Sequence, residues 1–149
     1  MASHFPYDVL IGYIGEGLIT CRLAQYFPMQ YKDGKSNAAD LVTRDGIKIE
    51  VKTDLLIPKW GNHYVEYKHN NHNSGISVTE SEWWAIVTPT ASLIVLTSDL
   101  KELAKGCEKS PQVRDGKTTH GLKVPMSKLL ELEPVLRMEG HRVIFPERA

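Results

Sequence analysis

Three charged residues, Asp40, Glu50 and Lys52, lie among alternating apolar residues in the stretch AADLVTRDGIKIEVKTD at positions 38–54. Within it, Asp45-Gly46 separates two segments rich in β-branched residues, a combination that predicts a β-hairpin. Glu50 and Lys52 are two residues apart, so their side chains project from the same face of the second strand. Counted outward from the Asp45-Gly46 turn, Glu50 and Lys52 lie at about the same distance along the hairpin as Asp40 on the partner strand. We therefore expect two carboxylates and one ammonium group to converge at one end of the hairpin.

This combination of groups suits metal-assisted hydrolysis of a phosphate ester. A pair of carboxylates suits Mg²⁺, a hard ion that takes oxygen ligands and keeps several waters. A metal ion stabilises the charge that develops on a phosphate oxygen, and Lys52 can hold or help to deprotonate the attacking water. The alternative is that Glu50 and Lys52 form the solvated face of an amphipathic strand, with a cross-strand ion pair. For an arbitrary protein that alternative would be preferred.

The elements that must position these residues can be predicted from periodicity and capping signals. Apolar residues at helical spacing, including Leu10, Ile14 and Leu18, predict a helix over 9–27 that ends before Pro28. After the hairpin we expect a third strand over 60–69, a helix over 78–84 with Thr79 as its N-cap, a strand over 92–97, a helix over 98–106, a polar loop over 108–121, a helical segment within 125–136 and a last strand over 141–145. With three meandering strands after the first helix, this order predicts an α/β fold whose mixed sheet is flanked by helices.

Asp40, followed by Glu50-Val51-Lys52 and preceded by Glu16 on the first predicted helix, resembles the motif of the PD-(D/E)xK nuclease superfamily. The predicted order of helix, hairpin, strand, helix and strand also matches the core of that superfamily. The tract GNHYVEYKHNNHNSGISVTESEWWAIV is similar to short phage-type and cyanobacterial-type nucleases. The resemblance covers roughly the first two-thirds of the chain and none of the residues after 106. One departure is Ala39, which stands where the family often has a proline with a backbone role.

The resemblance implies a role for each matching residue. Asp40 and Glu50, helped by the Val51 carbonyl, would bind Mg²⁺, and Mn²⁺ could substitute for it. Lys52 would orient the water nucleophile. Glu16 would reach a second metal ion or one of its waters.

The resemblance also implies a fold and an activity. The fold is a restriction-endonuclease-like core of the order αβββαβ in a single nuclease domain over 1–149, with 107–149 as a C-terminal extension. The activity is that of a Mg²⁺-dependent endodeoxyribonuclease, which hydrolyses DNA to a 5′-phosphate and a 3′-hydroxyl. One small domain offers one active site, so cleavage of both strands suggests a symmetric homodimer. Two alternatives stay open: a catalytically inactive DNA- or protein-binding module on the same fold, and an RNA-directed nuclease. The form and sequence of the DNA substrate also stay open.

Basic and polar residues near the expected metal site could contact phosphates, as Lys, Asn and Ser side chains commonly do. The candidates are Lys48, Lys68, His69, Asn71 and Ser74. The loop that holds most of them is rich in Asn and Gly, so an exposed polar turn is the alternative. His69 and His72 have HxxH spacing, but a zinc site would need further ligands.

Three other features have two interpretations each. Glu66 could support Glu50 if the third strand pairs in register, or it could be a surface residue paired with a neighbouring lysine. Trp83 and Trp84 are adjacent on one element, so we expect one in the core and the other at a dimer interface or a DNA surface. The basic segment RDGKTTHGLK at 114–123 could be a DNA-contacting loop or a solvated connection.

The bulk composition is that of an ordinary soluble globular protein. The chain has 149 residues, and 18 basic and 18 acidic side chains give a formal net charge of zero. A nucleic-acid binder is usually basic, so this balance is weak evidence against that role.

Cys21 and Cys107 form no CxxC pair and predict free thiols in a reducing compartment. We see no membrane-length apolar run, no secretory signal and no nucleotide-binding motif. We therefore expect no membrane partner, no nucleotide cofactor and a location in the cytoplasm of a bacterium or a phage-infected host cell.

Overall fold

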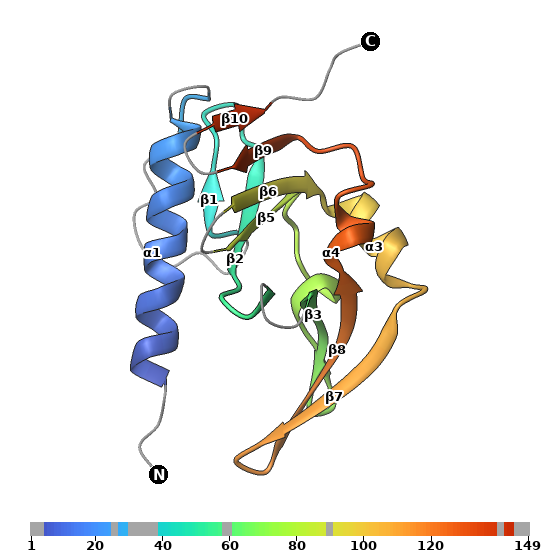
Figure 1. Cartoon of the computed structure of the whole chain (residues 1–149). Helices are drawn as coiled ribbons and strands as arrows, with labels where there is room; N and C mark the ends of the chain where they lie inside the picture. The colour runs from blue at the N-terminus through green and yellow to red at the C-terminus, as the bar shows by residue number, and fades with distance from the viewer. Residues whose placement is uncertain are drawn as a thin grey trace.

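The computed structural model describes residues 5–24, 27–29, 39–57, 61–88, 91–139 and 142–144 (Figure 1). The helices are α1 (Phe5–Leu23), the short 3₁₀ helix η1 (Gly75–Ser77), α3 (Thr97–Ala104) and α4 (Met126–Leu129). The strands are β1 (Leu41–Val42), β2 (Lys48–Thr53), β3 (Asn62–His69), β4 (His72–Asn73), β5 (Trp83–Val87), β6 (Ala91–Leu96), β7 (Glu108–Arg114), β8 (Lys117–Pro125), β9 (Leu136–Glu139) and β10 (Arg142–Ile144). Within these ranges, no helix combines the length and the apolar character needed to cross a membrane.

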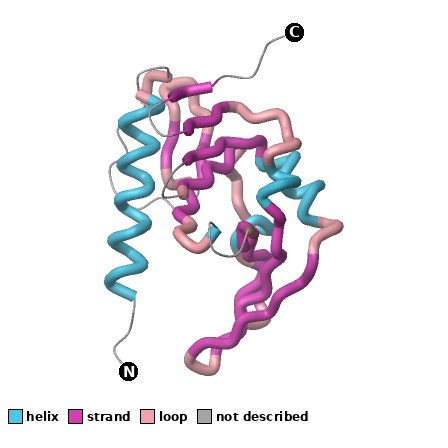
Figure 2. The backbone as a smooth tube through the Cα atoms, in the orientation of Figure 1, coloured by secondary structure: helices cyan, strands magenta, loops and turns pink. Residues whose placement is uncertain are grey.

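The strands form two separate sheets (Figures 1 and 2). The first sheet has six strands in the order β1-β2-β5-β6-β9-β10, in which β2 and β5 run parallel and the other neighbours antiparallel. The second sheet has four strands in the order β4-β3-β8-β7, all antiparallel. The predicted α/β class with a mixed sheet flanked by helices is confirmed.

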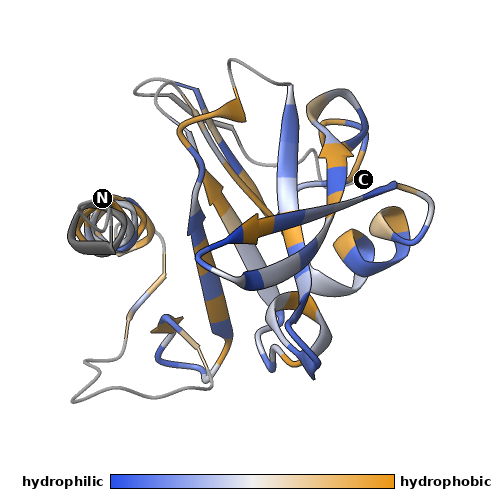
Figure 3. Ribbon diagram, turned by 90° about the horizontal axis from the view of Figure 1, so that it is seen from below, coloured by the Kyte–Doolittle hydropathy of each residue, from blue (hydrophilic) through white to orange (hydrophobic). Residues whose placement is uncertain are grey.

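Both faces of the first sheet are covered by other elements. On one face, Ile49, Val51 and Trp83 pack with Ile19 and Leu23 of α1. On the other face, apolar residues of β5 and β6 pack with residues of the second sheet, α3 and α4: Trp84, Ile86, Leu93, Val95, Val65, Val124, Leu100 and Leu129. Figure 3, which looks along α1, shows this helix on one side of the first sheet and α3 and α4 on the other. The first sheet is therefore the middle layer of three.

Strand β5 runs through the middle of the protein, and all five of its residues are buried. Successive strand residues face opposite sides, so Trp83 lies in the core beneath α1 and Trp84 in the core beneath the second sheet. The expectation that one tryptophan lies at a dimer interface or a DNA surface is wrong, because this sheet has a core on each face. The predicted helix over 78–84 is also wrong, because burial on both faces favours a strand for the run WWAIV.

Strand β3 does not follow β2 in a meander as predicted. It pairs with β8 in the second sheet, and β5 lies beside β2 instead. Because β2 and β5 are parallel, the chain must cross over between them, and β3, β4 and η1 lie on that connection. Glu66 of β3 therefore does not pair in register beside Glu50, and the supporting role that depended on such pairing is lost.

Residues 108–121, predicted to be a polar loop, instead form β7 and the first part of β8. The two strands pair along the whole of β7, from Glu108↔Lys123 to Arg114↔Lys117. The turn residues Asp115 and Gly116 have φ angles of 51° and 72°, as a type I′ hairpin turn requires. The sequence around this Asp-Gly pair lacks apolar alternation, which is why the strands escaped prediction.

Helix α1 is apolar on more than one side. Ile19 and Leu23 are buried against the first sheet, whereas Leu10, Ile14 and Leu18, which define the predicted apolar stripe, are exposed. The helix approaches β2 closely at Gly15, where an added Cβ would lie 1.7 Å from the Thr53 Oγ1. The absence of a side chain at Gly15 therefore sets how near the helix lies to the end of β2.

Candidate active site

Asp40 lies just beyond the end of β1, beside the middle of β2. Strands β1 and β2 pair through Leu41↔Ile49 and Val42↔Lys48. Beyond Leu41 the pairing is irregular, because the Asp40 N–H donates to the carbonyl of Ile49, the residue already paired with Leu41. Asp40 therefore lies at the open end of the hairpin, next to the segment of β2 that carries Glu50.

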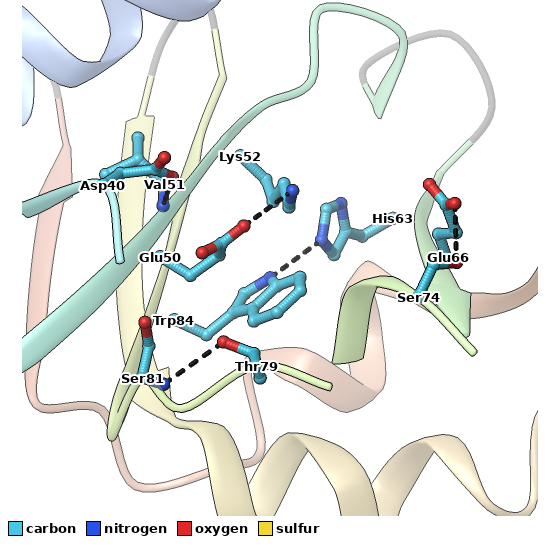
Figure 4. A network of polar contacts seen from close by, with 10 residues as sticks. All are labelled: Asp40, Glu50, Val51, Lys52, His63, Glu66, Ser74, Thr79, Ser81 and Trp84. Carbon is cyan, nitrogen blue, oxygen red and sulfur yellow. Dashed lines mark hydrogen bonds and ion pairs between the residues drawn. The ribbon is translucent and has the colours of Figure 1, made fainter. Parts of the chain in front are cut away.

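Asp40 covers the edge of β2 at the point where β1 ends. Its Oδ2 accepts a hydrogen bond from the Val51 N–H at 2.8 Å (Figure 4). Its own N–H donates to the Ile49 carbonyl at 3.1 Å. The N–H and C=O of one strand residue point to the same edge, so the Val51 carbonyl faces the edge that Asp40 occupies. Oxygen atoms of two residues thus meet at this edge.

Glu50 and Lys52 form an ion pair on the face of the first sheet that is turned away from α1. The Glu50 Oε1 lies 2.9 Å from the Lys52 Nζ, and this Nζ lies 5.5 Å from the centre of the Trp84 ring. The Lys52 side chain is 41% exposed. Its ammonium group is therefore held by a carboxylate and an aromatic face while remaining accessible to a substrate.

A buried chain of hydrogen bonds supports Trp84 (Figure 4). The Trp84 Nε1–H donates to the His63 Nε2 at 3.2 Å, and the His63 Nδ1 lies 3.1 Å from the Asp54 Oδ2. Because the indole N–H can only donate, Nε2 must accept, which places the proton of a neutral imidazole on Nδ1, where it donates to Asp54. His63 is only 2% exposed. The chain thus joins β3 of the second sheet to β5 of the first.

Asp54 carries the negative charge at the end of this chain. Burial raises the pKa of its carboxyl group, but the hydrogen bond from His63, together with backbone hydrogen bonds from Leu56 and Tyr64, outweighs burial and lowers the pKa. The Leu56 N–H donates to the Asp54 Oδ1 at 3.1 Å. Asp54 is therefore ionised at neutral pH and fixes the tautomer of His63.

A groove lies beside these residues, between α1 and the end of β2. Ile11 and Gly12 line it from the helix, and residues 51–56 line it from the strand and the segment that follows. Val51 and Lys52 of β2 belong to this wall. Leu55 and Leu56 are exposed apolar residues of the same wall.

Glu16 lies on α1, the helix that packs against the opposite face of the first sheet from Glu50. Its carbonyl accepts a hydrogen bond from the Thr20 Oγ1–H at 2.7 Å. Across the part of the chain that the structure describes, no three His, Cys, Asp or Glu side chains gather so that they could hold a metal ion together. The structure therefore brings Asp40, Glu50 and Lys52 to one end of the hairpin, but Glu16 does not join the two carboxylates in such a group.

The residues expected to contact nucleic acid lie in two places. Lys48 is on β2, where its Nζ lies 3.2 Å from the Glu80 Oε2. The others belong to β3 and the segment after it: Lys68, His69, Asn71 and Ser74.

The contacts of this second group are mostly within the protein. The His69 Nδ1 lies 3.1 Å from the Thr119 Oγ1, and the Ser74 Oγ–H donates to the Glu66 Oε1 at 2.8 Å. Asn71 is exposed in the turn between β3 and β4. His69 and His72 pair across β3 and β4.

Sequence reasoning missed Asp54, His63 and Trp84 as a connected group. One signal was available, because His63 alternates with Val65 on the buried side of β3. A histidine at an apolar position must satisfy both of its ring nitrogens, which points to buried partners. The identity of those partners depended on the packing of one sheet on the other.

Comparisons with protein-family models, with curated proteins and with solved structures gave no match to this chain.

Proposed function

We propose that this protein is a Mg²⁺-dependent nuclease that hydrolyses phosphodiester bonds in DNA. The observation that carries the proposal is that Asp40 binds the Val51 N–H through its carboxylate, directly beside the ion pair of Glu50 and Lys52 on the same strand. The order and types of these residues are those of the PD-(D/E)xK motif that the sequence resembles. The first sheet departs from the αβββαβ order that the resemblance implies, because β3 belongs to the second sheet and β5 runs parallel to β2.

The groups at the edge of β2 fit a hard cation. Asp40, Glu50 and the Val51 carbonyl offer only oxygen atoms, and so small a set leaves room for the waters that Mg²⁺ keeps. The contact from Asp40 to the Val51 N–H supports this set, because it holds the carboxylate at the edge that the Val51 carbonyl faces. Mn²⁺ accepts the same ligands and should substitute. When bound, the metal ion would stabilise the charge that develops on the phosphate oxygens.

Lys52 orients the nucleophile in this proposal. Its ammonium group donates a hydrogen bond to the attacking water, whose oxygen forms the new bond to phosphorus in line with the leaving 3′ oxygen. The bond from phosphorus to the 3′ oxygen breaks, the attacking water releases a proton to solvent, and the 3′ oxygen takes a proton from solvent. The products are a 5′-phosphate and a 3′-hydroxyl.

Trp84 has a positioning role. Its ring lies beneath the Lys52 ammonium group, and its indole N–H is held by His63, which Asp54 holds in turn. These contacts restrict where the ammonium group can lie relative to Glu50. A restricted ammonium group loses less entropy when it binds the water and the phosphate.

Each chain offers one such site. A single site cuts one strand at a time, so cleavage of both strands of a duplex or a junction would require two sites. A symmetric homodimer supplies two sites related by a two-fold axis. We therefore propose a homodimer as the active form.

One observation favours a second function, the binding of DNA or protein without catalysis. Glu50 and Lys52 already satisfy each other at 2.9 Å, as they would on a plain amphipathic strand. A third possibility, an RNA-directed nuclease, differs from the proposal only in substrate.

The test is a cleavage assay with purified protein. Linear, circular, single-stranded and four-way DNA and an RNA of matched sequence are incubated with Mg²⁺, with EDTA in parallel. We expect cleavage of DNA that requires the metal ion and is lost in Glu50→Gln, while Lys101→Ala, on the exposed surface of α3, retains it. Cleavage that survives EDTA or the Glu50→Gln substitution contradicts the proposal, and binding without cleavage supports the second function.

A further inference from the structure

The outer part of the second sheet forms an arm, which we define as residues 108–121. Every residue of β7 except Ser110 is exposed, and Val113, near the turn, is 74% exposed. Figure 1 shows the two strands extending beyond the body of the protein, with the tip on the side where β2 ends. The arm therefore presents a narrow antiparallel ribbon to any partner.

One face of the arm carries cationic and hydrogen-bonding side chains in register. The pairs Arg114↔Lys117 and Gln112↔Thr119 place four such residues on the same face. His69 of β3 lies opposite Thr119 and extends this face. Arg, Lys, Gln and Thr are side chains that form hydrogen bonds with base edges in the major groove.

The charge of the arm suits a polyanion. In a chain of zero formal net charge, the arm has more Lys and Arg than acidic residues, and two further lysines adjoin it, one on β3 and one farther along β8. The cations are Lys109, Arg114 and Lys117, with Lys68 and Lys123 adjoining, and the acids within the arm are Glu108 and Asp115. Glu66 of β3, on the same face, accepts a hydrogen bond from Ser74.

The outer edge of the arm is a poor site for pairing with a second copy of the chain. Strand β7 is the edge strand of the second sheet, and it contains Pro111, which has no N–H to donate to a further strand. Lys109 adds a charge to the same edge strand, a common protection against pairing between chains. The ribbon is therefore left to bind through its side chains.

We propose that the arm enters the major groove of duplex DNA, so that B-form duplex is the substrate class. The inference rests on the proposed function for the identity of the ligand. The major groove of B-DNA admits a two-stranded ribbon, whereas the major groove of an A-form RNA helix is too deep and narrow for its bases to be read by side chains. The arm then positions the chain along the duplex while the edge of β2 carries out the chemistry.

The first test measures binding without cleavage. Fluorescence anisotropy of a labelled duplex is recorded with the full chain in EDTA, over a range of salt concentrations. The double variant Arg114→Ala/Lys117→Ala should bind about tenfold or more weakly, and the slope of log K against log salt should fall in magnitude by about 1–2.

The matched control is Lys101→Ala/Lys105→Ala, which removes the same charge from the exposed surface of α3. It should bind duplex within about twofold of the unmodified chain, since it lies outside the arm. An equal loss in both double variants, or no loss in the arm variant, overturns the inference. Circular dichroism and a thermal melt establish that the variants fold, and Gln112→Ala supplies a milder variant on the same face.

The second test identifies the groove. In one duplex, glucosylated hydroxymethyl groups on the cytosines occupy the major groove. In a second sample, netropsin occupies the minor groove of an unmodified duplex. We expect the first to weaken binding and the second to leave it unchanged. The reverse pattern, or equal affinity for single-stranded DNA or duplex RNA, overturns the inference.

The two proposals can fail separately. If the chain cleaves DNA and the arm variant binds and cleaves as the unmodified chain does, the arm inference fails and the proposed function stands. If the chain binds duplex through the arm but cleaves nothing with Mg²⁺ or Mn²⁺, the proposed function fails and the arm inference stands.

Discussion

Strands β5 and β7 have the same backbone structure in nearly opposite environments. All five residues of β5 are buried, whereas six of the seven residues of β7 are exposed. Neighbours on both faces fix the position of a side chain in β5, whereas most side chains of β7 are exposed to solvent. Groups that must lie within hydrogen-bond distance of one another are best placed on the first sheet. Groups that must adapt to a partner are best placed on the second.

The largest effect we expect concerns Lys52, the candidate catalytic residue on the covered sheet. Lys52→Ala should lower the rate of DNA cleavage by about 10²–10⁴-fold, the usual range when a group that acts on the nucleophile is lost. The melting temperature should change little, because the side chain is partly exposed. Single-turnover cleavage in Mg²⁺ measures the rate. Cleavage that continues at the original rate would show that the chemistry lies elsewhere.

The second prediction compares one truncation in each sheet. Trp84→Ala, in the buried strand, should lower the free energy of unfolding by about 3–5 kcal/mol. Val113→Ala, in the arm, should change it by less than about 0.5 kcal/mol. Urea denaturation followed by circular dichroism measures both. A similar cost for the two substitutions would remove the contrast between the sheets.

The third prediction tests how α1 covers the first sheet. Gly15→Ala should destabilise the protein by about 1–3 kcal/mol, because the new methyl group meets the Thr53 hydroxyl. Gly17→Ala is the matched control on the same helix, where an added Cβ meets nothing within 4 Å. It should stabilise the protein by up to about 1 kcal/mol. If both substitutions have the same sign in thermal melts, the helix does not approach β2 as described.

The smallest effect concerns the link between the two sheets through Asp54. The pKa of Asp54 is lower in the folded state than its ordinary value of 3.8, which applies to the unfolded chain. The ionised carboxylate therefore stabilises the folded protein at pH values above 3.8, and this stabilisation is lost as the pH falls from 3.8 through the lower pKa of the folded state. Asp54→Asn should cost about 1–2 kcal/mol at neutral pH. The difference between the variant and the unmodified chain should shrink in urea titrations below pH 3.8. A constant difference down to acid pH would show that the carboxylate is not held by His63.

Local patterns predicted the elements whose environment is set by near neighbours. The alternation of Ile47, Ile49 and Val51 and the Asp45-Gly46 turn located the hairpin, and the pattern of residues 98–106 located α3 close to its observed bounds. The N-cap of α3 is Leu96, which makes no side-chain cap hydrogen bond. These inferences succeed because the hairpin and a short helix are decided within about ten residues of sequence.

Elements decided by distant contacts escaped prediction. The capping pattern at Thr79 was outweighed by burial of WWAIV on both faces, which depends on α1 and on the second sheet. The arm lacks apolar alternation because most of β7 meets solvent on both faces. The chain from Asp54 through His63 to Trp84 crosses from one sheet to the other, so no spacing in the sequence encodes it.

The strands of the two sheets alternate along the chain, and this affects how the protein can be made. In the second sheet, β3 and β4 precede β5 along the chain, and β7 and β8 follow α3. In the first sheet, β9 and β10 come after all the other strands. During synthesis on the ribosome, the apolar strands β5 and β6 must remain without part of their cover until most of the chain has emerged. A fragment ending at Gly106 would retain Asp40, Glu50 and Lys52 but lack strands from both sheets. We therefore expect that the segment with Asp40, Glu50 and Lys52 does not fold independently of the later strands.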